Sequence, residues 1–303
     1  MNRAILACLP GLLAGMLSLN SLAAENTIKQ LAVSEIHPTQ SAVGYDEIHY
    51  KATVDKASPA LLFSEFCESN GAGKVQHYDI HSEITRPDSF TCQSPYGTHP
   101  EEVKSAVIAP DHQVYLTDGH HTISIFRDMA GDKNFTFSVR ITHDLSNLPD
   151  MAAFWKWMVK NNQTWLKDPA GNSLQPAELP AQVGMKFMAD DTYRSVVYFL
   201  RSVAYKKPEN APPFLEFYLG DWLRHHQPVK PGELKTKAGY AAYLARAADA
   251  LVHASGEEHT TASPDSPTLA QSGKLDNVNV KKLARLSEKG GKLSVLFGES
   301  SKS

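Results

Sequence analysis

The sequence has few of the motifs from which a function can be assigned directly. It contains only three cysteines in 303 residues, and none lies at the short Cys/His spacing that zinc sites use. Walker, Rossmann and Gly-x-Ser-x-Gly motifs are missing, and there is no internal repeat. The formal net charge is −3 at pH 7. Because no overall positive charge attracts nucleic acid, any contact with it must be local.

Long apolar runs are also scarce, and the first 24 residues hold the longest. Arg3 precedes an apolar stretch from Ala4 to Leu19, and small residues suited to cleavage follow. Pro10-Gly11 interrupts the stretch, and nothing else approaches the roughly 18 apolar residues of a membrane helix. A lipid-modified cysteine would follow the apolar region, whereas Cys8 precedes most of it. We predict a signal peptide over residues 1–24, no transmembrane segment, and a periplasmic or secreted protein.

Removal of the leader leaves two cysteines, Cys67 and Cys92. An even count in an oxidising compartment predicts one disulfide bond, with two unpaired thiols as the less favoured alternative. The bond would close a loop of about 25 residues and contribute about 3 kcal/mol by chain-entropy reasoning. The loop is rich in glycine and proline, which favours irregular structure that benefits from a covalent link.

The most informative stretch runs from Val114 to Phe126. Its first three residues are typical of a short strand, Asp118-Gly119 breaks the chain, and Ile123, Phe126 and Ala130 recur at helical spacing. The pattern predicts strand, tight turn and helix. Residues 118–122 should therefore lie at a helix N-terminus.

This position suits an anion, because the first N–H groups of a helix are unpaired and the helix dipole is positive there. Gly119 allows a ligand to approach the backbone, and His120 and His121 can donate to phosphate or move protons. Asp118 could orient an imidazole or hold a divalent metal ion, and the identity of any cofactor stays open. The alternative is an ordinary turn in which Asp118 or Thr122 caps the helix.

The rest of the chain divides into three parts. We predict an α+β domain with a small mixed sheet over residues 25–148, a helical subdomain over 149–254, and a disordered tail over 255–303, where Gly, Ser, Thr, Glu and Lys dominate. The expected helices of the subdomain are Met151–Leu166, Asp190–Tyr205, Phe214–His226 and Lys235–His253. A transient basic helix is expected near Val278–Leu286.

Residues 118–122 resemble the Asp-Gly-His-His-Arg box of the ParB/sulfiredoxin fold, in particular the family of putative ParB-like nucleases. The resemblance covers roughly residues 28–255 and implies that the box contacts phosphate groups of a nucleotide or nucleic acid. Thr122 stands where Arg is usual, which removes a bidentate guanidinium. Gln40 follows a Pro-containing turn where related free-serine kinases have a catalytic Glu, and an amide is no base at neutral pH. Lys51, on a short helix marked by Tyr45, Ile48 and Ala52, could reach a phosphate.

These observations predict an exported ParB-like nuclease or phosphoesterase, a hydrolase acting on nucleic acid or a small phosphate ester. The predicted catalytic residues are Asp118, His120 and His121, and the predicted phosphate-binding residues are Gly119, Thr122, Lys51 and Gln40. One alternative is a non-catalytic module that captures an anionic metabolite, glycan or partner carboxylate at the same helix N-terminus. Another is an exported interaction protein whose helical half does the work. Convergence of the predicted residues on one concave site would favour catalysis, and the oligomeric state is left open.

Overall fold

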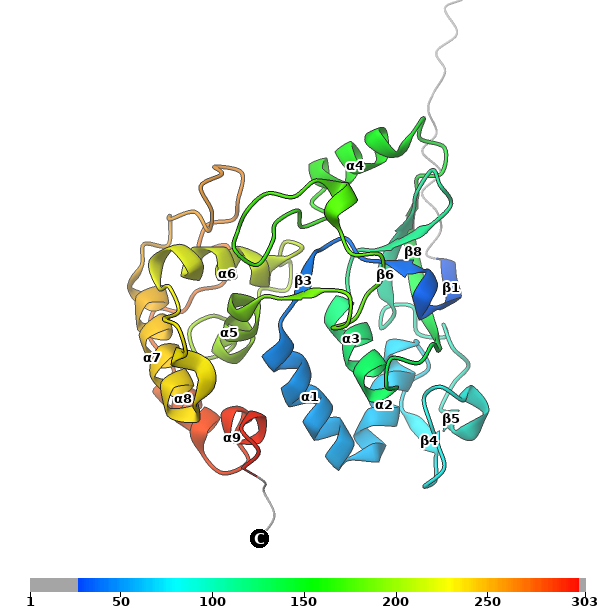
Figure 1. Cartoon of the computed structure of the whole chain (residues 1–303), viewed down its shortest axis with the longest axis horizontal. Coiled ribbons are helices and arrows are strands. Elements are labelled where there is room, and N and C mark those ends of the chain that lie inside the picture. The colour runs from blue at the N-terminus through cyan, green and yellow to red at the C-terminus, as the bar shows by residue number, and fades with distance from the viewer. Residues whose placement is uncertain (1–26, 300–303) are drawn as a thin grey trace, which may run out of the picture.

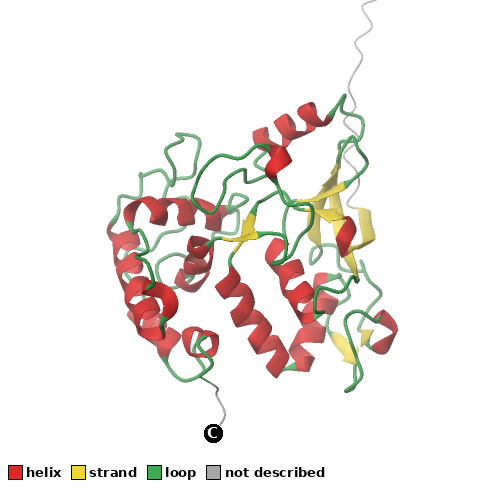
Figure 2. Cartoon of the chain, in the orientation of Figure 1, coloured by secondary structure: helices red, strands yellow, loops and turns green. Residues whose placement is uncertain are grey.

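The computed structural model describes residues 27–299, so the predicted signal peptide lies outside the described residues (Figure 1). The fold is α+β, as the sequence predicts: the sheet and its helices form one side of the molecule, and a group of helices forms the other (Figure 2). Within the described part of the chain, no helix is both long and apolar enough to cross a membrane.

The central element is a mixed five-stranded sheet with the strand order β1-β8-β6-β7-β2. The β1/β8 and β6/β7 pairs are antiparallel, and the β6/β8 and β7/β2 pairs are parallel. β6 and β7 thus form an antiparallel hairpin whose second strand leads into the box. The strands are β1 (Thr27–Ala32), β2 (Ile36–His37), β6 (Lys104–Ile108), β7 (Val114–Leu116) and β8 (Thr136–Asp144).

Alternating side chains give the sheet two apolar faces. Ala106 and Ile108 join a large buried cluster with the helices α1 (Tyr45–Ala57), α2 (Pro59–Ser69) and α3 (His120–Met129). Val107 belongs instead to a smaller cluster with Phe154 and Met158 of α4 (Met151–Lys160). Because both faces are covered, the end of β7 and the start of α3 are held in a fixed relation.

The predicted disulfide bond is present between Cys67 and Cys92, whose Cα atoms are 5.7 Å apart. It joins α2 to β5 (Thr91–Cys92), which pairs with β4 (Val75–His77). The bond thus secures the irregular segment that packs beside the sheet.

The helical side is built from α5 (Thr192–Leu200), α6 (Leu215–His226) and α7 (Lys237–His253) around a second buried cluster. Two of the four helices predicted between residues 149 and 254 are shorter than expected. The expected Met151–Leu166 helix ends at Lys160, because Asn162 adopts a left-handed conformation with φ 52°. The expected Asp190–Tyr205 helix ends at Leu200, and Ser202 follows with φ 65°.

The expectation of a disordered tail from residue 255 is wrong for residues 255–299. This segment contains α8 (Val280–Ser287) and α9 (Lys292–Leu296), and Leu269, Leu286 and Leu293 are buried in the helical cluster. The main chain is also tied down, since Leu275 N donates to Ala204 O at 2.8 Å. The polar composition of the segment indicates disorder, because its leucines are widely spaced. These leucines become buried only through tertiary contacts with the helical cluster.

The two sides meet along α1, which lies between the α2/α3 pair and the helices α5 and α9 (Figure 1). A short parallel pair adds to the junction: β3 (Ala42–Val43), just before α1, pairs with β9 (Ala189–Asp190), just before α5. The junction therefore brings the box, the start of α1 and the start of α5 close together.

Candidate functional site

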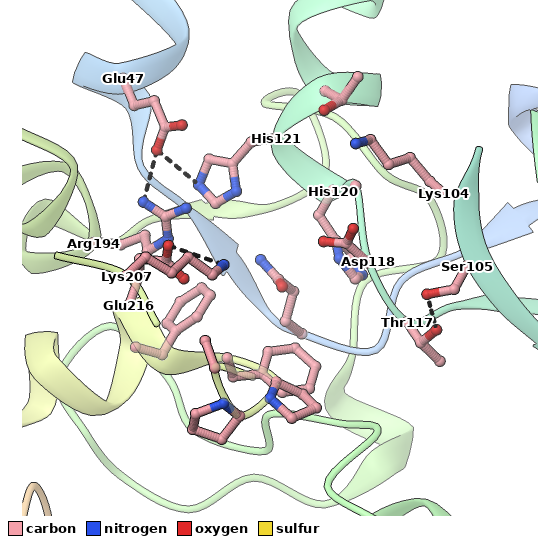
Figure 3. A pocket seen from close by; sticks show the side chains of 18 of the residues that line it. Glu47, Lys104, Ser105, Thr117, Asp118, His120, His121, Arg194, Lys207 and Glu216 are labelled. Atoms are coloured by element: carbon pink, nitrogen blue, oxygen red, sulfur yellow. Dashed lines mark hydrogen bonds and ion pairs between the residues drawn. The ribbon is translucent and has the colours of Figure 1, made fainter. Parts of the chain in front are cut away.

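A cavity of about 540 Å³ lies at this junction, and all seven predicted site residues line it. The box and α1 form one side, and segments of the helical half form the other (Figure 3). The predicted residues at the cavity are Gln40, Lys51, Asp118, Gly119, His120, His121 and Thr122. The sequence alone left open whether these residues converge, and in the structure they do. Their chemical roles stay predictions.

The turn before α3 depends on a glycine. Gly119 has φ 96°, a left-handed conformation that favours glycine, and a Cβ atom there would lie 2.4 Å from Lys104 Cγ. The Lys104 side chain thus lies directly against the turn. Thr117 Oγ1 donates to Ser105 Oγ at 2.8 Å, which fixes the strand end to β6. Any larger residue at position 119 would displace the turn or the lysine.

The α3 N-terminus is uncapped. Gly119 is the N-cap residue and no side chain accepts from the first turn, so neither Asp118 nor Thr122 caps the helix. Among residues 27–299, the main-chain N–H groups of His120, His121 and Thr122 have no hydrogen-bond acceptor. These three donors sit at the positive end of the helix dipole beside the cavity, where they suit an anion.

His120 is a buried neutral imidazole. It is 3% exposed, and Thr39 N donates to its Nε2 at 3.1 Å. Burial lowers the pKa of His120 to about 3, so the ring is neutral at pH 7 and carries its proton on Nδ1. In this state Nδ1–H can donate, while Nε2 is occupied.

His121 is held in the same way. Gly44 N donates to its Nε2 at 2.9 Å. Burial, followed by the charges of Arg194 and Lys51 and the neighbouring His120, holds the pKa of His121 well below its usual value. Glu47 Oε2 lies 3.8 Å from the same nitrogen, but a neutral ring that already accepts from Gly44 forms no ion pair with it. Both imidazoles therefore tie the segment from Thr39 to Gly44 to the box.

The sequence reasoning did not single out Glu47 and Arg194. Arg194 Nη1 donates to Glu47 Oε2 at 2.7 Å, and both side chains are buried. Arg194 is 7% exposed; within the described chain its Nε and Nη2 have no hydrogen-bond acceptor, although the residue lines the cavity. Glu47 precedes Lys51 by one helical turn, which places both on one face of α1 and is the signal that could have found it.

A second charged group on the helical side was also missed. Glu216 accepts from Arg201, and from Lys207 Nζ at 3.3 Å. Burial alone would raise the pKa of Glu216, but Arg194, Lys207 and Arg201 outweigh it and hold the pKa at about 2. The carboxylate is therefore charged at every pH at which the protein is expected to work.

The cavity carries a net positive charge. Five cationic and three carboxylate side chains line it, and with neutral imidazoles this leaves +2. Within the described residues, Lys51 and Lys104 form no ion pair, and the Asp118 carboxylate accepts no hydrogen bond. The cations are Lys51, Lys104, Arg194, Arg201 and Lys207, and the carboxylates are Glu47, Asp118 and Glu216.

Residues 27–299 contain no group of three or more His, Cys, Asp or Glu side chains arranged around a metal ion. Asp118 is the cavity carboxylate without a cationic partner among the described residues, so it is the cavity residue whose charge is free to attract a cation.

Two comparisons with known proteins agree with this fold. The family model described as "Putative ParB-like nuclease" matches residues 29–225, a range that includes the box and all the cavity-lining residues of the helical half. The crystal structure of protein Atu1540 from Agrobacterium tumefaciens is similar, with 19% identity and a TM-score of 0.52, and the match covers 80% of this chain and 97% of that one. At that identity the likeness shows the fold alone. A search of curated proteins found no match.

Proposed function

We propose that this chain, which belongs to the putative ParB-like nuclease family, is an exported nuclease or phosphoesterase that binds phosphate at the α3 N-terminus. The observation that carries the proposal is the convergence of the seven predicted residues on one cavity with a net charge of +2. Three unpaired main-chain donors, together with Lys51 and Lys104, would surround the phosphate oxygens.

The state of the two histidines supports a role in charge stabilisation rather than in proton transfer. Their Nε2 atoms accept from main-chain N–H groups, so neither ring can take a proton there without losing a hydrogen bond. A neutral imidazole can still donate through Nδ1–H and polarise an oxygen that gains charge. His120 and His121 therefore act as donors to the phosphate or as supports of the site.

Asp118 is then the proton acceptor of the proposed reaction. A water oxygen bonds to phosphorus, its proton passes to the Asp118 carboxylate, and the bond from phosphorus to the leaving oxygen breaks. The leaving oxygen takes a proton from water. If a divalent ion is required, Asp118 would hold it, the ion would supply charge stabilisation and a more acidic water, and Asp118 would then be its ligand rather than the proton acceptor.

The second candidate function is a non-catalytic anion-binding module. The observation that favours it is the same pair of main-chain hydrogen bonds, which fixes imidazoles that burial already keeps neutral. The missing Arg at Thr122 and the amide at Gln40 point the same way. Turnover therefore decides between the two functions.

The test is hydrolysis of DNA, RNA, and aryl phosphate monoesters and diesters, each with and without Mg²⁺, Mn²⁺ or Zn²⁺. Asp118→Asn should lower turnover about 10²-fold or more, as expected for loss of a general base, without changing the melting temperature. Asp88→Asn is the matched control, since Asp88 is exposed and remote from the cavity. Unchanged turnover in Asp118→Asn would exclude its catalytic role. Phosphate binding without turnover, weakened in Lys104→Gln and kept in Asp118→Asn, would establish the binding module.

Export is the second part of the proposal. The leader-like residues 1–24 and the Cys67–Cys92 disulfide support it, because disulfide bonds persist in oxidising compartments. Expression in bacteria followed by fractionation should recover the chain from the periplasm or medium, with no thiol available for labelling. Retention in the cytoplasm of a chain with an intact leader would contradict it.

A further inference from the structure

We infer that the cavity takes a small phosphate monoester with a flat apolar group, rather than a polynucleotide. This inference rests on the proposed phosphate site and names the class of substrate that fits it. The volume of about 540 Å³ falls within the roughly 300–1,000 Å³ of small-molecule sites.

The wall contributed by the chain before and within α6 carries an apolar, partly aromatic patch beside the charged Lys207 and Glu216. Pro212, Pro213, Phe214 and Phe217 line the cavity, whereas the box lines it with polar groups. Phe217 is buried and its ring centroid lies 5.5 Å from that of Trp165, so the wall has firm support. A ligand that spans the cavity would place an anionic group on the box and an apolar group on this wall.

Phe214 is held in an unusual conformation. Its φ is 60°, the left-handed region that side chains other than glycine rarely adopt, and it occupies the N-cap position of α6. Backbone strain of this kind concentrates at ligand-binding sites. The strained position places an aromatic side chain at the cavity, although glycine would satisfy this backbone conformation more easily.

The charges match one phosphate monoester. The net charge of the cavity is +2, and a phosphate monoester carries about −1.5 to −2 at neutral pH. Glu47 and Glu216 already neutralise part of the cationic set. A polynucleotide gains its affinity from many phosphate contacts, and a chain with a net charge of −3 offers no general attraction for them.

Two buried polar side chains face the space between the box and the wall. Gln40 is 3% exposed and donates through Nε2 to Ala42 O at 2.6 Å, while its Oε1 accepts no hydrogen bond from the described residues. Arg194 likewise keeps Nε and Nη2 without an acceptor there. Together they offer one acceptor and further donors to polar atoms of a bound ester.

The experiment compares four probes by calorimetric titration of the purified protein: inorganic phosphate, methyl phosphate, phenyl phosphate, and a single-stranded oligonucleotide without terminal phosphates. Phenyl phosphate should bind about tenfold more tightly than methyl phosphate, as expected for one stacked ring. The oligonucleotide should not displace it. In Phe214→Ala the preference should fall to about twofold or less while methyl phosphate binding is kept.

Phe187→Ala is the matched control, because Phe187 is a half-buried ring outside the cavity, and it should keep the full preference. Equal affinities for phenyl and methyl phosphate in the unmodified protein would overturn the inference without touching the phosphate site. Tighter binding and displacement by the oligonucleotide would also overturn it. If none of the phosphate probes binds, the proposed function itself fails, so the two failures are distinguishable.

Discussion

The two sides of the cavity are built on different principles. On the sheet side, most of the predicted site residues are five consecutive residues, 118–122, and main-chain hydrogen bonds to His120 and His121 hold them. On the helical side, they are single side chains spread from Arg194 to Phe217, and the cations among them pair with the buried carboxylates Glu47 and Glu216. Consecutive site residues form a local motif that can be recognised in a sequence. Scattered site residues can be recognised only when the fold brings them together.

The largest expected effect comes from the ion pair that joins the two sides. Arg194→Leu should lower the free energy of unfolding by about 3–5 kcal/mol, because it leaves Glu47 charged, buried and unpaired. The double variant with Glu47→Gln should recover part of this loss. Urea unfolding monitored by fluorescence measures both.

Lys56→Gln is the control for this prediction. Lys56 forms an ion pair with Asp128 at 3.3 Å, but its side chain is 60% exposed, so the change should cost less than about 1 kcal/mol. Equal losses in Arg194→Leu and Lys56→Gln would mean that the pair across the junction stabilises no more than a surface pair.

The same contrast explains how much of the fold the sequence predicts. Alternating apolar residues and Asp118-Gly119 encode β7, the turn and α3 locally, so these elements are found where expected. Helix ends were less certain, because apolar residues continue past Lys160 and only the left-handed Asn162 ends α4. The order of residues 255–299 was missed, since burial of Leu286 and Leu293 depends on α7, far away in the sequence.

For the site, the sequence predicts the residues of the box, Gln40 just before β3, and Lys51 on α1. Glu47 was within reach, because it lies one helical turn before Lys51. Arg201 and Lys207 carry no such signal, since they lie outside the helices, their partner Glu216 lies in α6, and no motif links them. Their role depends on tertiary contacts that residue spacing does not record.

The next largest effect concerns residues 255–299, which their composition predicts to be disordered. Leu293→Ala in α9 should lower the free energy of unfolding by about 2–3 kcal/mol, the low end for a buried leucine because a short helix near the C-terminus can relax. Leu61→Ala, in α2 and 36% exposed, should change it by no more than about 0.5 kcal/mol. If the tail were disordered in solution, the two variants would be equally stable in thermal unfolding.

A smaller effect tests the neutral imidazole. The folded pKa of His120 is about 3 and the unfolded value is about 6.5, so between these values the unfolded chain binds a proton that the folded chain does not. Stability from this source is fully present above about pH 6.5 and is lost as the pH falls toward 3. Its slope is at most about 1.4 kcal/mol per pH unit.

His120→Gln should therefore flatten the dependence of unfolding free energy on pH between about 4 and 6. His77→Gln, at an exposed position in β4, should leave the slope unchanged. The readout is a set of urea titrations at several pH values. A slope that is the same in all three proteins would show that His120 is accessible to protons in the folded state.

The smallest expected effect tests whether an arginine at position 122, on the sheet side of the cavity, can replace Arg194 of the helical side as a phosphate contact. Thr122→Arg restores the guanidinium usual in the family and should tighten phosphate binding by about three- to tenfold, because a bidentate contact is added. If Arg194 already contacts the phosphate from the helical side, the gain should be larger in an Arg194→Gln background than in the unmodified protein. Titration of inorganic phosphate into the four proteins of this cycle measures the coupling. Equal gains in both backgrounds would show that the two guanidinium groups serve different parts of the ligand, and the helical side would then recognise something other than the phosphate.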